Sequence, residues 1–257
     1  FALTLPSETV IAEQMDVIDP QAIHAVRQFL RRSLAARLRT DWEVAYQDNR
    51  TPGDYSPDAL SAGRRGLKNL ALSYLMELDD SDAHQLAQTQ YDNANNMTDR
   101  LAGLVALTNS SAPGRADALA RFYEEFAGEA LVIDKWFMLQ ANARTTDVAA
   151  VRTLMQHPAF TLKNPNRARS LLFGFCNGNP ARFHAPDGSG YQFWAEQVIA
   201  LNALNPQVAA RLARSLDRWR KYAPALQDKM RAALKQVADT RNLSKDVAEV
   251  VTKALSN

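Results

Sequence analysis

The sequence predicts an all-α protein folded as an irregular right-handed superhelix of stacked helix pairs. Three observations support this prediction. Apolar residues recur at steps of three or four along the whole chain, which is the period of an α-helix. No segment shows the sustained apolar–polar alternation, rich in Val, Ile and Thr, that indicates strands. Glycine is scarce, at 10 of 257 residues, which disfavours turn-rich β folds.

Four apolar stripes predict the long helices, in chain order. The first runs over residues 23–42, which we interpret as one long helix with a buried face. The others run over residues 208–219, 226–237 and 247–255. Their apolar positions are Val208, Leu212, Leu216 and Trp219; Leu226, Met230, Leu234 and Val237; and Val247, Val250, Val251 and Leu255.

Pairs of a capping residue and a proline predict where helices begin. The cap oxygen accepts a bond from an unpaired amide of the first turn, and proline at the first helical position has no amide to lose. These pairs are Asp19-Pro20, Ser56-Pro57, Asn164-Pro165, Asn179-Pro180 and Asn205-Pro206, and Ser7 and Ser244 are further caps. About a dozen helices result. Because that exceeds what one bundle core can seat, we favour a stack of helix pairs over a closed bundle.

The widest predicted breaks between helices are residues 47–55 and 175–191. The second concentrates glycine, proline and polar residues in a chain that is otherwise poor in glycine. It is either an ordinary connector or a loop held in a special shape for a purpose.

Composition and motifs exclude several functions. Thirty basic and 28 acidic residues leave a net charge of +2, too balanced for a general polyanion binder, so we expect no nucleic-acid partner. No apolar run reaches the roughly 18 residues of a membrane span. The four histidines are far apart, so we expect no metal site and no bound cofactor. The single cysteine, Cys176, has no nearby histidine to activate it, and we expect it to be inert in the core.

One polar arrangement has a candidate binding function. Gln207, Arg211, Arg214 and Arg218 are spaced by four, three and four residues, on one face of a helix. Residues 205–235 hold eight basic and two acidic side chains, whereas residues 77–100 hold six acidic and one basic. The stripe is either a solvated face, paired with the acidic segment, or a row of guanidinium groups that receives an anionic group. Arg167 and Arg169 would join it in the second case.

Six segments together resemble one family, the C-terminal domain of bacterial aminopeptidase N. They are residues 16–20 (DVIDP), 95–99 (NNMTD), 132–137 (VIDKWF), 164–170 (NPNRARS), 183–191 (FHAPDGSGY) and 205–209 (NPQVA), and they span nearly the whole chain. The resemblance implies one bowl-shaped, ARM/HEAT-like α-superhelical domain over residues 1–257. The chain starts with Phe1 rather than methionine, which fits a piece whose N-terminal and catalytic domains are absent.

The resemblance also implies a function. The parent enzyme is a zinc-dependent, broad-specificity aminopeptidase, and its zinc motif, His-Glu-x-x-His, is absent from this sequence. The segment would therefore hold no zinc and be inactive alone, with no catalytic residue. It would wall the active-site chamber, contact the catalytic domain of the same polypeptide and bind peptide substrates through Gln207, Arg211 and Arg169. Arg214 and Arg218 have no such support, and we expect them to face solvent.

Two alternatives remain open. The first is a free-standing helical-repeat scaffold that binds a protein. The second is an independent enzyme, which is disfavoured because the sequence has no clustered nucleophile, base or metal-binding set. For either the segment or the parent we expect a cytoplasmic location and no membrane contact.

Overall fold

The computed structural model of the chain describes residues 3–256, and helices make up their regular structure. These residues include no β-strand, and one isolated parallel bridge joins Ile18 and Tyr222. The prediction of an all-α protein is therefore confirmed. No helix within residues 3–256 is long and apolar enough to cross a bilayer.

The described chain groups into two compact units. Unit 1 comprises residues 3–5 and 25–129, and unit 2 comprises residues 6–24 and 130–256. A single domain over residues 1–257 stays a prediction.

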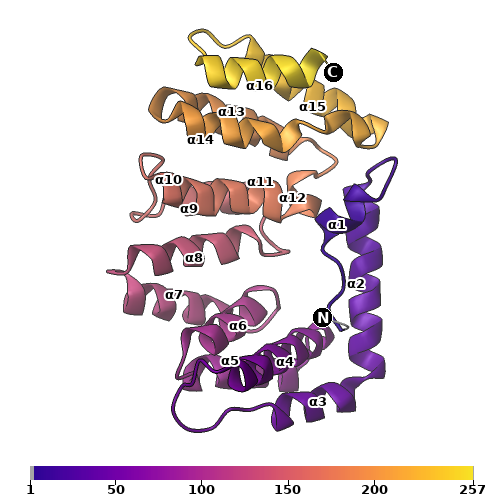
Figure 1. The fold of residues 1–257 in the computed structure, drawn as a ribbon, viewed down its shortest axis with the longest axis vertical. Helices are drawn as coiled ribbons and strands as arrows, with labels where there is room; N and C mark the ends of the chain where they lie inside the picture. The colour runs from indigo at the N-terminus through magenta and orange to yellow at the C-terminus, as the bar shows by residue number, and fades with distance from the viewer. Residues whose placement is uncertain (1–2, 257) are drawn as a thin grey trace. The chain divides into compact units, whose positions relative to one another are not determined.

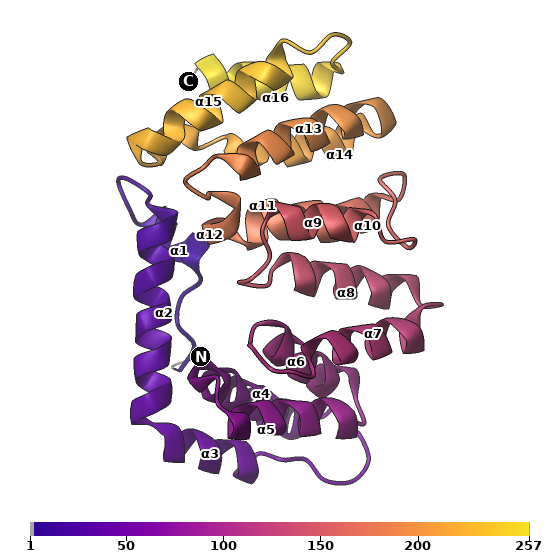
Figure 2. The same ribbon diagram turned by 180° about the vertical axis from the view of Figure 1, so that it is seen from behind.

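In unit 1, α3 to α7 pack on near neighbours in sequence, and α2 runs along their side (Figures 1 and 2). Most of α2 belongs to it, and α4 packs against α3 and α6, while α6 also packs against α5 and α7. The bounds are α2 (Pro20–Arg37), α3 (Arg39–Asp48), α4 (Ala59–Leu75), α5 (Ser81–Asn93), α6 (Met97–Thr108) and α7 (Arg115–Phe126), with a 3-10 turn η1 (Met76–Leu78) after α4.

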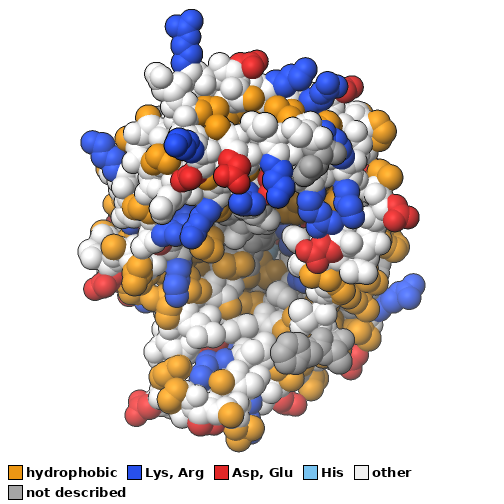
Figure 3. Space-filling view, turned by 45° about the horizontal axis from the view of Figure 1, so that its top comes forward, with side chains coloured by type: hydrophobic (Ala, Val, Ile, Leu, Met, Phe, Trp, Pro, Cys, Tyr) orange, Lys and Arg blue, Asp and Glu red, His pale blue; other side chains and the backbone are white. Residues whose placement is uncertain are grey.

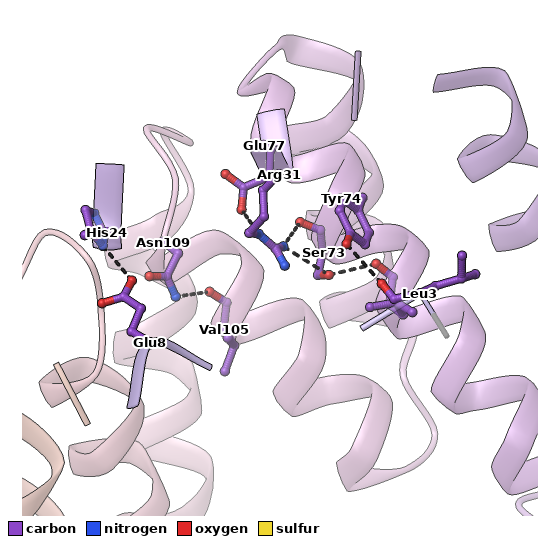
Figure 4. Close-up of polar contacts among 10 residues, drawn as sticks. Leu3, Glu8, His24, Arg31, Ser73, Tyr74, Glu77, Val105 and Asn109 are labelled. Atoms are coloured by element: carbon purple, nitrogen blue, oxygen red, sulfur yellow. Dashed lines mark hydrogen bonds and ion pairs between the residues drawn. The ribbon is translucent and has the colours of Figure 1, made fainter. Parts of the chain in front are cut away.

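Side chains of α2, α3 and α4 contact one another within this unit through a ring stack and hydrogen bonds. The Tyr74 ring stacks on Trp42 with 4.3 Å between centroids, and its hydroxyl donates to the carbonyl of Leu3. Beside it, Arg31 Nε donates to Glu77 Oε1 at 2.6 Å and its Nη2 donates to the carbonyl of Ser73 (Figure 4). A buried carboxylate thus has a guanidinium partner.

The prediction of one continuous helix over residues 23–42 is wrong. α2 ends at Arg37 and α3 begins at Arg39, because Leu38 leaves the helical conformation with φ −113° and ψ 25°. The Trp42 amide donates to the carbonyl of Leu38 and its indole Nε1 donates to the carbonyl of Leu34 at 3.2 Å, so α3 stays hydrogen-bonded to the end of α2. Of the stripe, Ile23 and Trp42 are buried, whereas Val26 is 67% exposed and Leu30 is also exposed.

Unit 2 is built of layers of helices that follow one another along the chain (Figures 1 and 2). α13 packs on α14 and α15, and both of these pack on α16. The bounds are α1 (Glu8–Glu13), α8 (Ala130–Ala141), α9 (Val148–Met155), α10 (Pro165–Ala168), α11 (Gly174–Gly178), α12 (Pro180–Phe183), α13 (Ser189–Leu204), α14 (Pro206–Ala213), α15 (Pro224–Ala238) and α16 (Lys245–Ser256). A π-helical turn, η2 (Arg169–Phe173), joins α10 to α11, and two 3-10 turns, η3 (Arg214–Leu216) and η4 (Trp219–Lys221), follow α14.

The three C-terminal stripes form the core of these layers. All of their predicted apolar positions are buried except Leu255, which is half-buried. The Trp194 side chain is fully buried between them, and its Nε1 donates to the carbonyl of Leu212 at 2.9 Å. Helical periodicity therefore identified this part of the core.

Most of the predicted helix starts are confirmed. Asn205 Oδ1 accepts from the amide of Val208 at 3.1 Å, and Asn164 and Ser7 cap α10 and α1 in the same way. Two starts differ. Asp58, not Ser56, caps α4.

Asn179 precedes α12 as predicted but does not cap it. Its Nδ2 instead donates to the carbonyls of Ala141 (3.0 Å) and Ala143 (2.8 Å), because it is buried against the end of α8. The break predicted over residues 175–191 is also shorter than expected, since α11, α12 and the start of α13 occupy most of it.

Candidate functional site

Gln207 and Arg211 lie one turn apart on α14, whose start is set by Asn205 and Pro206. Both side chains are exposed, whereas the residues that follow them in sequence, Val208 and Leu212, are buried. Within residues 3–256 neither makes a side-chain hydrogen bond or ion pair. The helix thus presents an amide and a guanidinium group with all their hydrogen-bonding capacity available.

Arg169 occupies a different place, at the first residue of the π turn. Its Nε donates to the carbonyl of Pro165 at 3.1 Å and its Nη2 donates to Asn166 Oδ1 at 2.6 Å. It lines a cleft of about 630 Å³ together with Met138, Asn142 and other residues of α8, α10 and α11. Gln207 and Arg211 do not line this cleft, so the three predicted residues do not share it.

Arg167 does not join the arginine stripe. It is buried, and its Nε donates to Asp134 Oδ1 at 2.6 Å while Nη1 and Nη2 donate to the carbonyls of Ala159 and Ala130. Its guanidinium group also lies over the Phe137 ring, 5.0 Å from the centroid. With these partners Arg167 holds α10 against α8 and offers nothing to a ligand.

A second cleft of about 470 Å³ was not predicted. Its lining includes Arg214, Ser215, Asp217 and Arg218 from the turns after α14, together with residues of α1, the start of α2, α11 and α12. Arg214 and Arg218 are exposed, as predicted, but they also border this cleft. The prediction of all four stripe residues on one helical face is wrong, because α14 ends at Ala213 and 3-10 turns follow it. The wall from residues 8–23 comes from a segment distant in sequence and could not be predicted from spacing.

The charges around this second cleft are only partly compensated. Arg214 Nη1 lies 3.4 Å from Asp217 Oδ2, and burial raises the pKa of Asp217 more than Arg214 lowers it. Glu8 is already paired, since its Oε1 lies 2.7 Å from His24 Nδ1 (Figure 4). The described residues leave Ser215 Oγ buried without a hydrogen-bond partner.

His184 and Cys176 form part of the cleft's inner side. His184 is almost fully buried, its Nδ1 is hydrogen-bonded to the Tyr191 hydroxyl at 3.0 Å, and burial lowers its pKa to about 3. Burial raises the pKa of the Cys176 thiol, so the thiol stays protonated and is a poor nucleophile. Both side chains therefore behave as neutral core groups.

The buried His184 predicts a loss of stability in mild acid. The unfolded chain binds a proton at His184 below about pH 6.5, whereas the folded chain does not until about pH 3. Because the unfolded state binds more protons in this window, the free energy of unfolding falls as the pH falls, by about 2 kcal/mol between pH 7 and pH 5. Urea unfolding of wild type and His184→Gln at both pH values measures this fall in the free energy of unfolding. If the free energy of unfolding changed with pH equally in the two proteins, the prediction would be contradicted.

The acidic segment 77–100 has its basic partners inside unit 1. Arg31 pairs with Glu77, Arg39 with Asp80, and Lys68 with Asp99 at 2.6 Å. These pairs supply the charge compensation for which the arginine stripe was considered.

In the view of Figure 3, Lys and Arg side chains gather over the upper part of the face, where the C-terminal helices lie.

Zinc, which the resemblance implies for the parent enzyme, finds no donor set here. Within residues 3–256 no three His, Cys, Asp or Glu side chains are grouped so that they could hold a metal ion.

Comparison with known proteins identifies the family. The family model described as "Domain of unknown function (DUF3458_C) ARM repeats" matches residues 1–256. The chain belongs to this family. An ARM-repeat family agrees with the predicted stack of helix pairs.

The chain is also similar to segments of longer proteins. It is 43% identical to aminopeptidase N of Escherichia coli (strain K12) over 255 residues, which are 99% of this chain and 29% of that protein. It is 41% identical to aminopeptidase N of Haemophilus influenzae over 254 residues, or 98% of this chain and 29% of that protein. The chain therefore spans under a third of the length of these relatives.

A solved structure shows the same fold. The crystal structure of Legionella pneumophila aminopeptidase A in complex with aspartic acid superposes with a TM-score of 0.90 at 31% identity, over 98% of this chain and 31% of that one.

Proposed function

We propose that this chain is the C-terminal, non-catalytic domain of a zinc-dependent aminopeptidase that removes N-terminal amino acids from peptides. The observation that carries the proposal is the coverage of the alignments. Nearly the whole chain matches aminopeptidase N proteins, but it accounts for only 29% of their length. Zinc and the hydrolytic groups would then belong to the rest of the polypeptide, which would be cytoplasmic.

The role proposed for this domain is to wall the active-site chamber and contact the substrate. An enclosed chamber excludes folded proteins, admits short peptides and keeps water away from the reaction. Gln207 would offer an adaptable donor and acceptor near the first substrate side chain. Arg211 and Arg169 would supply positive charge for peptide carboxylates or carbonyls, since a guanidinium group offers two parallel donors.

The proposed partner is the catalytic domain of the same polypeptide. An exposed apolar face on α2 supports such a contact, because Val26, Phe29 and Leu30 lie at helical spacing on one side and Phe29 is 72% exposed. Exposed apolar side chains gathered on one face are typical of protein contact surfaces. No nucleic-acid or membrane partner is proposed.

The proposal predicts that Arg211→Ala, in the complete polypeptide that contains this chain, raises KM for short peptides about tenfold and leaves kcat nearly unchanged. The reason is a loss of about 1.4 kcal/mol of substrate binding that is shared by the ground state and the transition state. Steady-state kinetics with several peptides measures it. Arg231→Ala, which removes an exposed arginine of α15, is the matched control and should change neither constant.

Two results would contradict different parts of the proposal. Unchanged kinetics on all peptides would remove Arg211 from the substrate site. A complete, zinc-loaded polypeptide without aminopeptidase activity would overturn the function itself.

A further inference from the structure

The cleft of about 470 Å³ beside residues 214–218 is lined by positively charged, negatively charged and apolar side chains. We call it the Arg218 cleft. Every residue that lines it belongs to unit 2, so its shape depends on one compact unit. Its volume is in the lower part of the range of small-molecule sites, which run from about 300 to 1,000 Å³.

One side of the Arg218 cleft offers unused hydrogen-bond donors. Within the described chain the guanidinium group of Arg218 makes no hydrogen bond or ion pair, and Ser215 Oγ is buried without a partner. A buried hydroxyl without a partner is uncommon and costs free energy until a ligand or water satisfies it. A guanidinium fork and a hydroxyl donor together suit a carboxylate.

The opposite charge comes from Asp217. Its side chain is 37% exposed, and its one ion-pair partner among the described residues, Arg214, is at a long 3.4 Å. Burial raises the pKa of Asp217 more than Arg214 and Lys253 lower it. An ammonium group would supply the missing partner. Glu8, which also lines the cleft, is hydrogen-bonded to His24.

Part of the lining of the Arg218 cleft is apolar. Ile18 and Ile23, both buried, line it together with Pro20, Pro180 and Cys176. An aliphatic side chain in contact with these residues would lose its exposure to water, at about 25 cal/mol for each Å² buried.

We propose that the Arg218 cleft binds the zwitterion of a free, apolar α-amino acid, with its carboxylate on Arg218 and Ser215, its ammonium group on Asp217 and its side chain on Ile18 and Ile23. A ligand with one charge would leave Arg218 without a partner or Asp217 with Arg214 as its only partner among the described residues. The site rests on these groups alone. Only the statement that such amino acids are products of the parent reaction rests on the proposed function.

The chain offers a direct test by NMR, because it has five isoleucines and two of them line the cleft. With the δ1 methyl groups of isoleucine labelled with ¹³C, L-leucine is titrated into the full chain. Saturable shifts of the Ile18 and Ile23 signals are expected, with a Kd of about 1 mM or below, which corresponds to about −4 kcal/mol. The signals of Ile133 and Ile199, which lie elsewhere in unit 2, should stay unchanged and report that the fold is intact.

Ligand and protein variants test each charge separately. N-acetyl-leucine lacks the ammonium group and leucinamide lacks the carboxylate, and each should bind at least tenfold more weakly than leucine. Arg218→Gln and Asp217→Asn should weaken leucine binding by the same factor, whereas Arg231→Gln, on exposed α15, should not.

The proposal is overturned if leucine causes no saturable shift of Ile18 and Ile23 at up to about 20 mM, or if it binds no better than its two derivatives. It is also overturned if Arg218→Gln binds leucine like wild type. Aminopeptidase activity of the complete polypeptide is a separate measurement, so leucine binding without activity would remove the proposed function and keep this site.

Discussion

Arg167→Met is expected to lower the free energy of unfolding by about 3 to 5 kcal/mol, because it leaves a buried carboxylate without its partner. Asp134 and Arg167 meet at 2.6 Å with side chains only 11% and 7% exposed. The same substitution removes the donors to the carbonyls of Ala159 and Ala130.

Urea unfolding monitored by circular dichroism measures this loss, with Arg152→Met as the matched control. Arg152 pairs with Glu196 at 2.5 Å, but the two side chains are 48% and 35% exposed, so its loss should cost under about 1 kcal/mol. The double variant Asp134→Leu/Arg167→Met should recover part of the stability, because no buried charge is left unpaired. Equal effects at Arg167 and Arg152 would refute the argument.

Gly190→Ala is expected to destabilise unit 2 by about 3 kcal/mol, because a methyl group there has no space. A Cβ atom at Gly190, in the first turn of α13, would overlap the carbonyl oxygen of Phe183 and lie 2.8 Å from its carbonyl carbon. The obstacle is backbone at the end of α12, which cannot move aside as a flexible side chain would.

Thermal unfolding of Gly190→Ala and of Gly66→Ala separates this steric effect from helix propensity. Gly66 is exposed inside α4, with no atom within 4 Å of an added Cβ, so alanine there should stabilise by about 0.5 to 1 kcal/mol. A melting temperature of Gly190→Ala at or above that of wild type would show that α12 and α13 are not closely packed.

Gly190 also bears on the segment 175–191, which was either a connector or a loop of special shape. Gly188 has φ +81°, a conformation that favours glycine, and Gly190 is required by the close approach of two helices. The concentration of glycine in this segment thus has a conformational reason at Gly188 and a packing reason at Gly190.

Helix starts and core positions near the C-terminus could be predicted because they depend on near neighbours. The cap from Asn205 to Val208 spans three residues, and the stripe through Met230 and Leu234 repeats every three or four. The same local pattern failed over residues 23–42, where the chain turns at Leu38 and part of the stripe stays exposed. A periodic stripe shows which side of a helix is apolar, but not whether another segment covers it.

For the candidate sites, local sequence was enough to place Gln207 and Arg211 on one helical face, because residues four apart always lie one turn apart. It could not show that Arg167 meets Asp134, 33 residues away, nor that Arg218 borders a cleft whose other wall comes from residues 8–23. These outcomes depend on which distant segments pack together, and that is set by the burial of apolar faces across the whole unit rather than by any spacing within a helix.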